Sequence, residues 1–136
     1  MSFGAGFTAP APGDACPCGS GEAFATCCGP LLAGQPAPTA ERLMRSRYTA
    51  FATGDAAHLN RTWHPRTRPA ELGLDARQRW TGLRILSSIA GGEEDAEGIV
   101  AFEASWTEGA ERGTLRERSR FSRRGGRWVY VDGDVG

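Results

Sequence analysis

Lysine is absent from the sequence, and all sixteen basic residues are arginines. Sixteen aspartates and glutamates balance them, so the formal net charge is zero. A nucleic-acid binder that relies on bulk positive charge is therefore disfavoured. Four cysteine thiolates around one divalent metal ion would make the loaded protein slightly acidic, which disfavours that role further.

Long apolar stretches are also missing. No segment approaches the roughly 20 apolar residues that a membrane-spanning helix needs, and the first fifteen residues lack the basic start and apolar run of a secretory signal. The sequence predicts a cytoplasmic protein with no membrane contact, and there thiols and metal thiolates are favoured over disulfides. A length of 136 residues suits one ordinary domain with a small appendage.

The sequence does contain four closely spaced cysteines, Cys16, Cys18, Cys27 and Cys28. A structural zinc ion is held by four Cys or His ligands in a tetrahedron, and this C-x-C-x8-C-C unit supplies four. Disulfides between such close and adjacent cysteines are geometrically awkward, and the C-x-x-C redox motif is absent. A four-thiolate iron–sulfur site stays open as an alternative. We predict one structural zinc ion, with no vacant coordination position for catalysis.

Composition and periodicity divide the chain into segments. Residues 1–15 are rich in Gly, Ala and Pro and are predicted to form a loose tail, on which Phe3 and Phe7 could dock. Residues 16–29 form the cysteine unit, and residues 30–38 form a proline-containing linker. The remaining residues, 39–136, are predicted to form the main domain.

Two helices are predicted at the start of this domain, and strands follow them. Thr39 can cap a helix that runs to Thr53, where Gly54 ends it, and Asp55 can cap a second helix to about Trp63. From Arg79 onward, four segments alternate with period two and are joined by short turns, which predicts an antiparallel meander. The fold class is therefore α+β, with two helices packed on a four-stranded sheet.

The cysteine unit, CPCGSGEAFATCCG, resembles the SEC-C motif, the zinc knuckle at the C-terminus of the SecA translocase ATPase. The matching positions are the four cysteines together with Pro17, Gly19, Ser20, Gly21 and Phe24. The SecA form carries lysines that are thought to help it recognise partners, whereas this chain has Glu22, Ala23, Ala25 and Thr26 at those places. Binding to the SecB chaperone or the ribosome is therefore not carried over with the motif.

The rest of the chain resembles the YchJ-like family, in which this motif precedes a nuclear-transport-factor-2-like domain. The residues that carry the resemblance are GPLLAG, Leu43–Phe51, Thr62–Pro65, Trp80 and the closing RWVYVDG. The resemblance implies one zinc ion in the knuckle and a cone-shaped domain over residues 39–136. In the related fold, the open mouth of the cone often holds small molecules.

One charge is predicted on each side of the core. Helical periodicity places Arg47 within the apolar arc of the first helix, and strand alternation places Glu117 on the same face as Leu115 and Phe121. We therefore expect these two side chains to approach each other, because a buried charge without a partner is strongly unfavourable. Either a closed structural salt bridge or a polar patch lining a cavity would satisfy this pattern. The opposite side of the same helix is predicted to be solvated and carries Arg42, Ser46, Thr49 and Thr53.

Tyr48, Trp63 and His64 complete the candidate pocket around Arg47 and Glu117. His64 is an acid–base group by type, although a histidine at a helix end more often caps or packs. The outward stripe of arginines at 116, 118 and 120 is expected to be partly neutralised by Glu103 on the neighbouring strand.

The sequence contains no nucleophile–base pair, phosphate loop or paired catalytic carboxylates. This favours a binding protein, an adaptor that recognises a protein partner or a ribosome-associated surface through the knuckle. The alternative is an enzyme or receptor whose cone takes a small anionic ligand near Arg47, since arginine suits carboxylate and phosphate.

Overall fold

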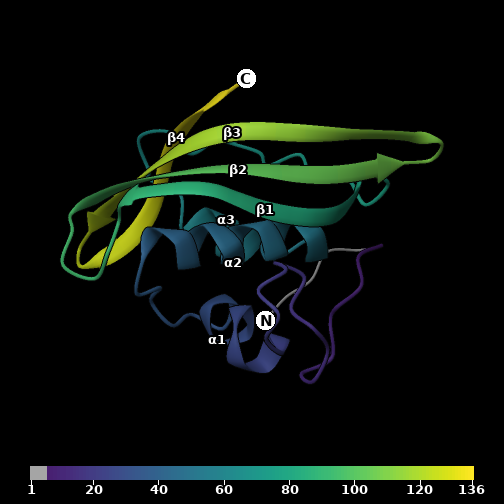
Figure 1. Ribbon diagram of the computed structural model, residues 1–136, viewed down its shortest axis with the longest axis horizontal. Helices are drawn as coiled ribbons and strands as arrows, with labels where there is room; N and C mark the ends of the chain where they lie inside the picture. The colour runs from purple at the N-terminus through teal and green to yellow at the C-terminus, as the bar shows by residue number, and fades with distance from the viewer. Residues whose placement is uncertain (1–5) are drawn as a thin grey trace.

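The computed structural model describes residues 6–136 and has three layers (Figure 1). Its elements are a 3-10 helix Phe24–Thr26, α1 Cys28–Leu32, α2 Ala40–Thr53, α3 Ala56–Arg61, β1 Arg79–Ala90, β2 Glu97–Glu108, β3 Glu111–Arg124 and β4 Arg127–Val135. The strands form an antiparallel sheet in the order β1-β2-β3-β4. The sheet curves over α2 and α3, while α1 and the cysteine unit lie on the other side of α2. The predicted α+β class is confirmed.

Helix α2 has the predicted bounds, and α3 begins where the sequence predicts but ends at Arg61, two residues before the predicted end. Thr39 accepts a hydrogen bond from the backbone N–H of Arg42, and Asp55 accepts one from that of His58. Gly54 takes the left-handed conformation that ends α2. The ring of Phe7 packs where a Cβ at position 54 would lie, so this position needs glycine on two counts. Phe7 therefore docks on the main domain, whereas Phe3 lies outside the described residues.

The strand alternation is also as predicted. Val100, Phe102 and Phe121 are buried on the sheet face that meets α2, where they pack against Leu43 and Met44. This face of the sheet and the apolar arc of α2 form the main core.

The opposite side of α2 is not solvated, and that prediction is wrong. Ser46 and Thr49 are 0% exposed and Thr53 is also buried, because α3 and the cysteine unit cover them. The hydroxyl of Thr49 lies 3.9 Å from Cys16 Sγ, and those of Ser46 and Thr53 are satisfied within α2. Ser46 Oγ donates to the carbonyl of Leu43 (2.7 Å) and Thr53 Oγ1 to that of Thr49 (2.7 Å). Small hydroxyl side chains thus let a second layer pack closely on α2 without stranding polar groups.

The segments around the cysteines are more ordered than composition predicts. Helix α1 extends into the predicted linker, with Pro30 in its first turn. Part of the predicted loose tail is tied to the cysteine unit, since Asp14 O accepts from Phe24 N (2.8 Å) and Ala15 forms a β-bridge with Ala23. Among residues 6–136, no helix combines the length and the apolar character needed to cross a membrane.

Candidate metal centre and cone cavity

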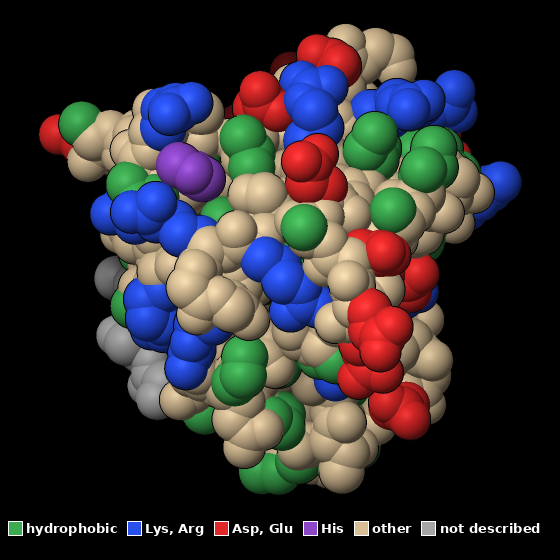
Figure 2. All heavy atoms as spheres, turned by 90° about the vertical axis from the view of Figure 1, so that its left-hand side faces the viewer, with side chains coloured by type: hydrophobic (Ala, Val, Ile, Leu, Met, Phe, Trp, Pro, Cys, Tyr) green, Lys and Arg blue, Asp and Glu red, His purple; other side chains and the backbone are tan. Residues whose placement is uncertain are grey.

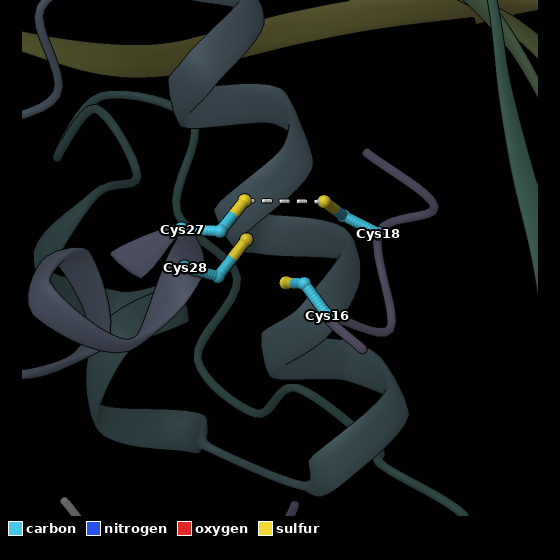
Figure 3. Close-up of side chains that lie close together, drawn as sticks. All are labelled: Cys16, Cys18, Cys27 and Cys28. Carbon is cyan, nitrogen blue, oxygen red and sulfur yellow. Dashed lines mark hydrogen bonds between the residues drawn. The ribbon is translucent and has the colours of Figure 1, made fainter. Parts of the chain in front are cut away.

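The four cysteine sulfurs converge on one point (Figure 3). All lie within 4.8 Å of one another, and the Sγ atoms of Cys18 and Cys27 are 3.6 Å apart. A tetrahedral zinc site with Zn–S bonds of about 2.3 Å requires sulfur–sulfur separations of about 3.8 Å. All four side chains are buried. The cluster therefore has the donor set and the spacing of a closed four-thiolate metal site.

Local turns bring the cysteines together. Gly19 and Gly21 both have positive φ, at 76° and 88°, which allows the chain to reverse directly after Cys18. The hydroxyl of Ser20, between these glycines, lies 3.2 Å from Cys27 Sγ. Phe24 is buried in the same cluster and covers the site, as its position in the motif predicts.

The electrostatics of the thiols favour a cation at this point. Hydrogen bonds from the thiols of Cys16 and Cys28 lower the pKa of Cys18 far below its ordinary range. Contacts of the Cys28 thiol with Cys16 and then with Cys18 raise the pKa of Cys28. Burial raises the pKa of Cys27 to about 11. Without metal, one thiolate is thus stabilised at the expense of its neighbours. A divalent cation would allow all four sulfurs to be thiolates together.

Two arginines of α2 fasten the cysteine unit to the helix. Arg45 Nη1 donates to the carbonyl of Cys18 (2.9 Å), and Arg42 Nη2 donates to that of Cys27 (3.4 Å). Arg45 Nε also pairs with Glu41 (3.1 Å). Arg42 and Arg45 are three residues apart and so lie on one face of α2. The sequence does not indicate that a second layer of structure covers this face. The cysteine unit and α2 therefore pack together as one body.

A second site lies between α2 and the sheet. It is a cavity of about 210 Å³ whose wall is mainly apolar, with Phe51, Trp80, Phe102 and Leu115 among its residues. Four of the five predicted pocket residues line it, namely Arg47, Tyr48, Trp63 and Glu117, and Tyr130 of β4 joins them. We refer to it as the cone cavity.

Arg47 is held at the wall of the cone cavity by backbone and aromatic groups. Its side chain is 3% exposed, and Nη1 donates to Leu59 O (3.1 Å) and Thr62 Oγ1 (2.7 Å). The guanidinium carbon lies 4.8 Å from the ring centroid of Trp63 and 4.6 Å from that of Tyr130, a cation–π arrangement. Burial lowers the pKa of Arg47 to about 9, which leaves it charged at neutral pH.

Glu117 forms no ion pair with Arg47, so of the two alternatives the closed salt bridge is wrong and the polar patch lining a cavity is found. Glu117 Oε2 accepts hydrogen bonds from the hydroxyls of Ser119 and Tyr130. Both charges do lie on the faces that periodicity predicts and line the same cavity. The carbonyl of Leu59, near the end of α3, holds the guanidinium instead, and no pattern in α2 or β3 reveals that acceptor.

The two phenols of the cavity stay protonated. Burial raises the pKa of Tyr48 to about 12, and burial together with the charge of Glu117 raises that of Tyr130 further. Both rings also pack edge-on against tryptophans, Tyr48 against Trp80 and Tyr130 against Trp63. At neutral pH they are hydrogen-bond donors, without a negative charge.

His64 does not line the cone cavity. Its backbone N–H donates to Tyr130 O (2.8 Å), and its Nδ1 accepts from the backbone N–H of Arg66 (3.1 Å). His64 therefore stabilises the turn that follows α3.

The buried histidine is His58, which the sequence reasoning missed. Its Nε2 lies 2.9 Å from Ser46 Oγ, and its position three residues after the capping Asp55 is the only sequence signal.

The arginine stripe on the outer face of the sheet is partly neutralised, as predicted. Glu103 pairs with Arg116 (2.7 Å) and more loosely with Arg84 (3.9 Å), and Arg120 pairs with Asp132 and Asp134. Arg118, which lies between Arg116 and Arg120 on β3, forms no ion pair with a described residue.

Two family descriptions match the chain. Residues 14–30 match the SEC-C motif, and residues 39–133 match the family described as YchJ, middle NTF2-like domain. The UPF0225 protein SCO1677 of Streptomyces coelicolor is 54% identical over 124 residues, which span 90% of this chain and 97% of that protein. A UPF0225 protein of Chromobacterium violaceum is 50% identical, over 89% of this chain and 93% of that protein.

Two solved structures of SEC-C motif containing proteins are also similar to this chain. A SEC-C motif containing protein from Rhodopseudomonas palustris is 34% identical, with a TM-score of 0.77 over 90% of this chain and 99% of that chain. A SEC-C motif containing protein from Psychrobacter arcticus, 22% identical, has a TM-score of 0.71 over 90% of this chain and 83% of that one, and shows the shared fold.

Proposed function

This chain belongs to the YchJ family of NTF2-like domains preceded by a SEC-C motif, and on that premise we propose that it is a zinc protein whose cone cavity binds a small organic anion. In this proposal the metal has a structural role and the cavity has the binding role. The observation that carries the binding role is Arg47, a buried cation on the cavity wall that has no carboxylate partner among the described residues.

Zinc is the metal that best fits the cysteine unit. Four thiolates in a tetrahedron are a common structural zinc site, and the site has no open position for water or substrate. The sulfur–sulfur spacing supports a single ion. The unit rests on α2, the helix that carries Arg47, and a zinc ion would therefore hold that helix from its far side.

The donors of Arg47 support recognition of an anion. Both of its hydrogen bonds come from Nη1, while Nε and Nη2 make none within the part of the chain that the structure describes. A guanidinium presents its N–H groups as a planar fork that matches a carboxylate. A carboxylate in the cavity would supply the missing counter-charge to a buried cation.

The rest of the wall limits what the anion can be. Most lining residues are apolar, so the ligand needs an apolar body as well as a charged end. A volume of about 210 Å³ suits a single ring or a short chain. Glu117 lines the same cavity, and its charge would repel a second carboxylate. The ligand class is therefore a small monocarboxylate.

Benzoate and its uncharged analogue benzamide test this proposal by isothermal titration calorimetry. We expect benzoate to bind and benzamide to bind far more weakly. Arg47→Met should weaken benzoate by about 30-fold, because charge-assisted hydrogen bonds contribute about 2 kcal/mol. Arg116→Met, which changes an arginine on the outer sheet face, is the matched control. Equal binding of the two compounds, or of benzoate to wild type and Arg47→Met, would contradict the proposal.

A second candidate function is the adaptor role of the knuckle, through a protein or ribosome-associated surface. Its support is an exposed rim, which includes Gly19, Glu22 and Thr26 and is fixed by a buried metal site. Such a preformed surface loses little conformational entropy on binding. A pull-down with the wild-type chain and a Glu22→Arg, Thr26→Arg variant tests it. A specific protein captured only by the wild type would support the adaptor, and capture of nothing above background would oppose it.

A further inference from the structure

A second cavity, of about 220 Å³, lies on the end of the molecule shown in Figure 2. It is bounded by the connection from α1 to α2, by the end of α3 and by the turn between β3 and β4. Trp63 lines both this cavity and the cone cavity. Four arginines line it, namely Arg61, Arg68, Arg124 and Arg127, and no Asp or Glu does. We call it the arginine cleft.

The charge of this cleft is not cancelled locally. None of its four arginines forms an ion pair with a described residue, and no carboxylate lines the cavity to which they converge. Figure 2 shows basic side chains gathered over one part of this face and acidic side chains along another edge. A chain with zero net charge therefore concentrates four positive charges around one hollow.

Neutral acceptors hold three of these guanidinium groups. Arg61 Nη2 donates to Leu32 O (3.0 Å), Arg127 Nη1 to Gly34 O (3.1 Å) and Arg68 Nη2 to Trp63 O (3.2 Å). A backbone carbonyl orients a guanidinium without neutralising it, and each group keeps further N–H donors. Arg124 makes no side-chain hydrogen bond within the described residues. The cleft is thus partly preorganised while its charge remains available.

His58 lies at the buried side of the cleft. Ser46 Oγ donates its only hydrogen to Leu43 O, so it accepts from Nε2–H of His58 (2.9 Å). The Nδ1 lone pair then faces Arg61 Nη2, 3.5 Å away. His58 therefore adds no charge of its own and helps to orient Arg61.

We propose that the arginine cleft binds a phosphate group, either as inorganic phosphate or on a small phosphomonoester. Four guanidinium groups exceed the single charge of a carboxylate, whereas a phosphate group carries close to two negative charges and three strong acceptor oxygens. Planar guanidinium forks suit those oxygens. This site is separate from the monocarboxylate site of the cone cavity, and either can fail without the other.

The four tryptophan indole N–H signals provide the readout. Trp128 lines the cleft only and donates from Nε1 to Pro38 O (3.3 Å), Trp80 lines only the cone cavity of these two, and Trp106 packs on Gly113 of the sheet. Inorganic phosphate and glycerol phosphate are titrated at constant ionic strength, set with sodium chloride, and followed by ¹H–¹⁵N correlation spectra. We expect a saturable shift of Trp128 with no shift of Trp106.

Arg124→Gln is the central variant, because Arg124 makes no described hydrogen bond that the fold would lose. We expect it to weaken phosphate binding about tenfold, and Arg127→Gln to do the same, while Arg116→Gln leaves binding unchanged. Failure of Trp128 to shift, or equal affinity in Arg124→Gln, would overturn the proposal. So would a short single-stranded RNA that binds the same residues more tightly than glycerol phosphate, with steep salt dependence.

Discussion

The cysteine unit and the cone cavity lie on opposite sides of α2, and their buried polar groups differ in whether they have partners. On one side of α2, four cysteine sulfurs face one another in a closed, fully buried site that leaves no room for a ligand. On the other side, Arg47 is just as buried but faces open space and has only neutral acceptors. A closed set of donors stabilises the fold, whereas an unpaired buried cation is costly to the fold. This difference is why we assign structure to the first and binding to the second.

The largest effect should come from breaking the closed site. Cys27→Ser removes one of four ligands, and we expect the metal to be lost and the free energy of unfolding to fall by on the order of 5 kcal/mol. The cone domain should persist, because the face of α2 beneath the knuckle carries Ser46 and Thr49, whose small hydroxyl side chains tolerate water. Metal analysis, chemical denaturation and backbone amide spectra of residues 16–29 and of β3 measure this.

Ser20→Ala is the matched control for that variant. It keeps all four thiols and removes one hydroxyl contact to Cys27 Sγ. The free energy of unfolding should therefore fall by only about 1 kcal/mol, and the metal should be retained. Comparable losses from the two substitutions would mean that packing of the loop, and not the metal, stabilises the knuckle.

The opposite side of α2 should respond in the opposite way. Arg47→Met should change the free energy of unfolding by no more than about 1 kcal/mol while it weakens benzoate binding by about 30-fold. The reason is that Glu117 keeps its hydroxyl partners, Ser119 and Tyr130, when Arg47 is gone. A loss of about 3–5 kcal/mol, the usual cost of stranding the partner of a buried ion pair, would show that Glu117 depends on Arg47 after all.

The contrast between the two sides also explains what the sequence could predict. The convergence of the four cysteines, the caps Thr39 and Asp55 and the strand alternation depend on residues close together in the chain, and these predictions were confirmed. The partner of Arg47 was mispredicted because Leu59 O, from the next helix, competes with Glu117. The burial of Ser46 and Thr49 depends on how the knuckle docks, which helix periodicity does not encode. The arginine cleft was missed because its residues come from segments far apart in the sequence.

An intermediate effect on stability, between those of Cys27→Ser and Ser20→Ala, is expected from pH through His58. Burial, and then the charges of Arg47 and Arg61, lower the pKa of His58 to about 3 from its usual 6.5. Between these values the unfolded chain binds a proton that the folded chain does not, so stability falls as the pH drops through this window. Between pH 7 and pH 5 we expect a loss of about 2 kcal/mol. His58→Gln keeps a hydrogen-bond donor for Ser46 but cannot titrate. In denaturation curves measured at several pH values, its free energy of unfolding should therefore lack this loss between pH 7 and pH 5. An unchanged slope would contradict a neutral, buried His58.

The smallest effect is expected on the outer face of the sheet. Arg116→Gln breaks an exposed pair with Glu103, and exposed pairs contribute about 0–1 kcal/mol. A change in the free energy of unfolding of about 0.5 kcal/mol or less, further reduced by salt, is the expected result. A change as large as that of Ser20→Ala would mean that this face is more than a solvated surface.

X-ray absorption at the zinc edge, on protein purified without added metal, tests the central assignment most directly. We predict about one zinc per chain, surrounded by four sulfur atoms at about 2.3 Å with no oxygen or nitrogen ligand. That result would establish a closed site and leave binding to the other side of α2. An oxygen ligand in place of one sulfur would give the metal an open position, and iron in place of zinc, or four free thiols in a folded knuckle, would contradict the account outright.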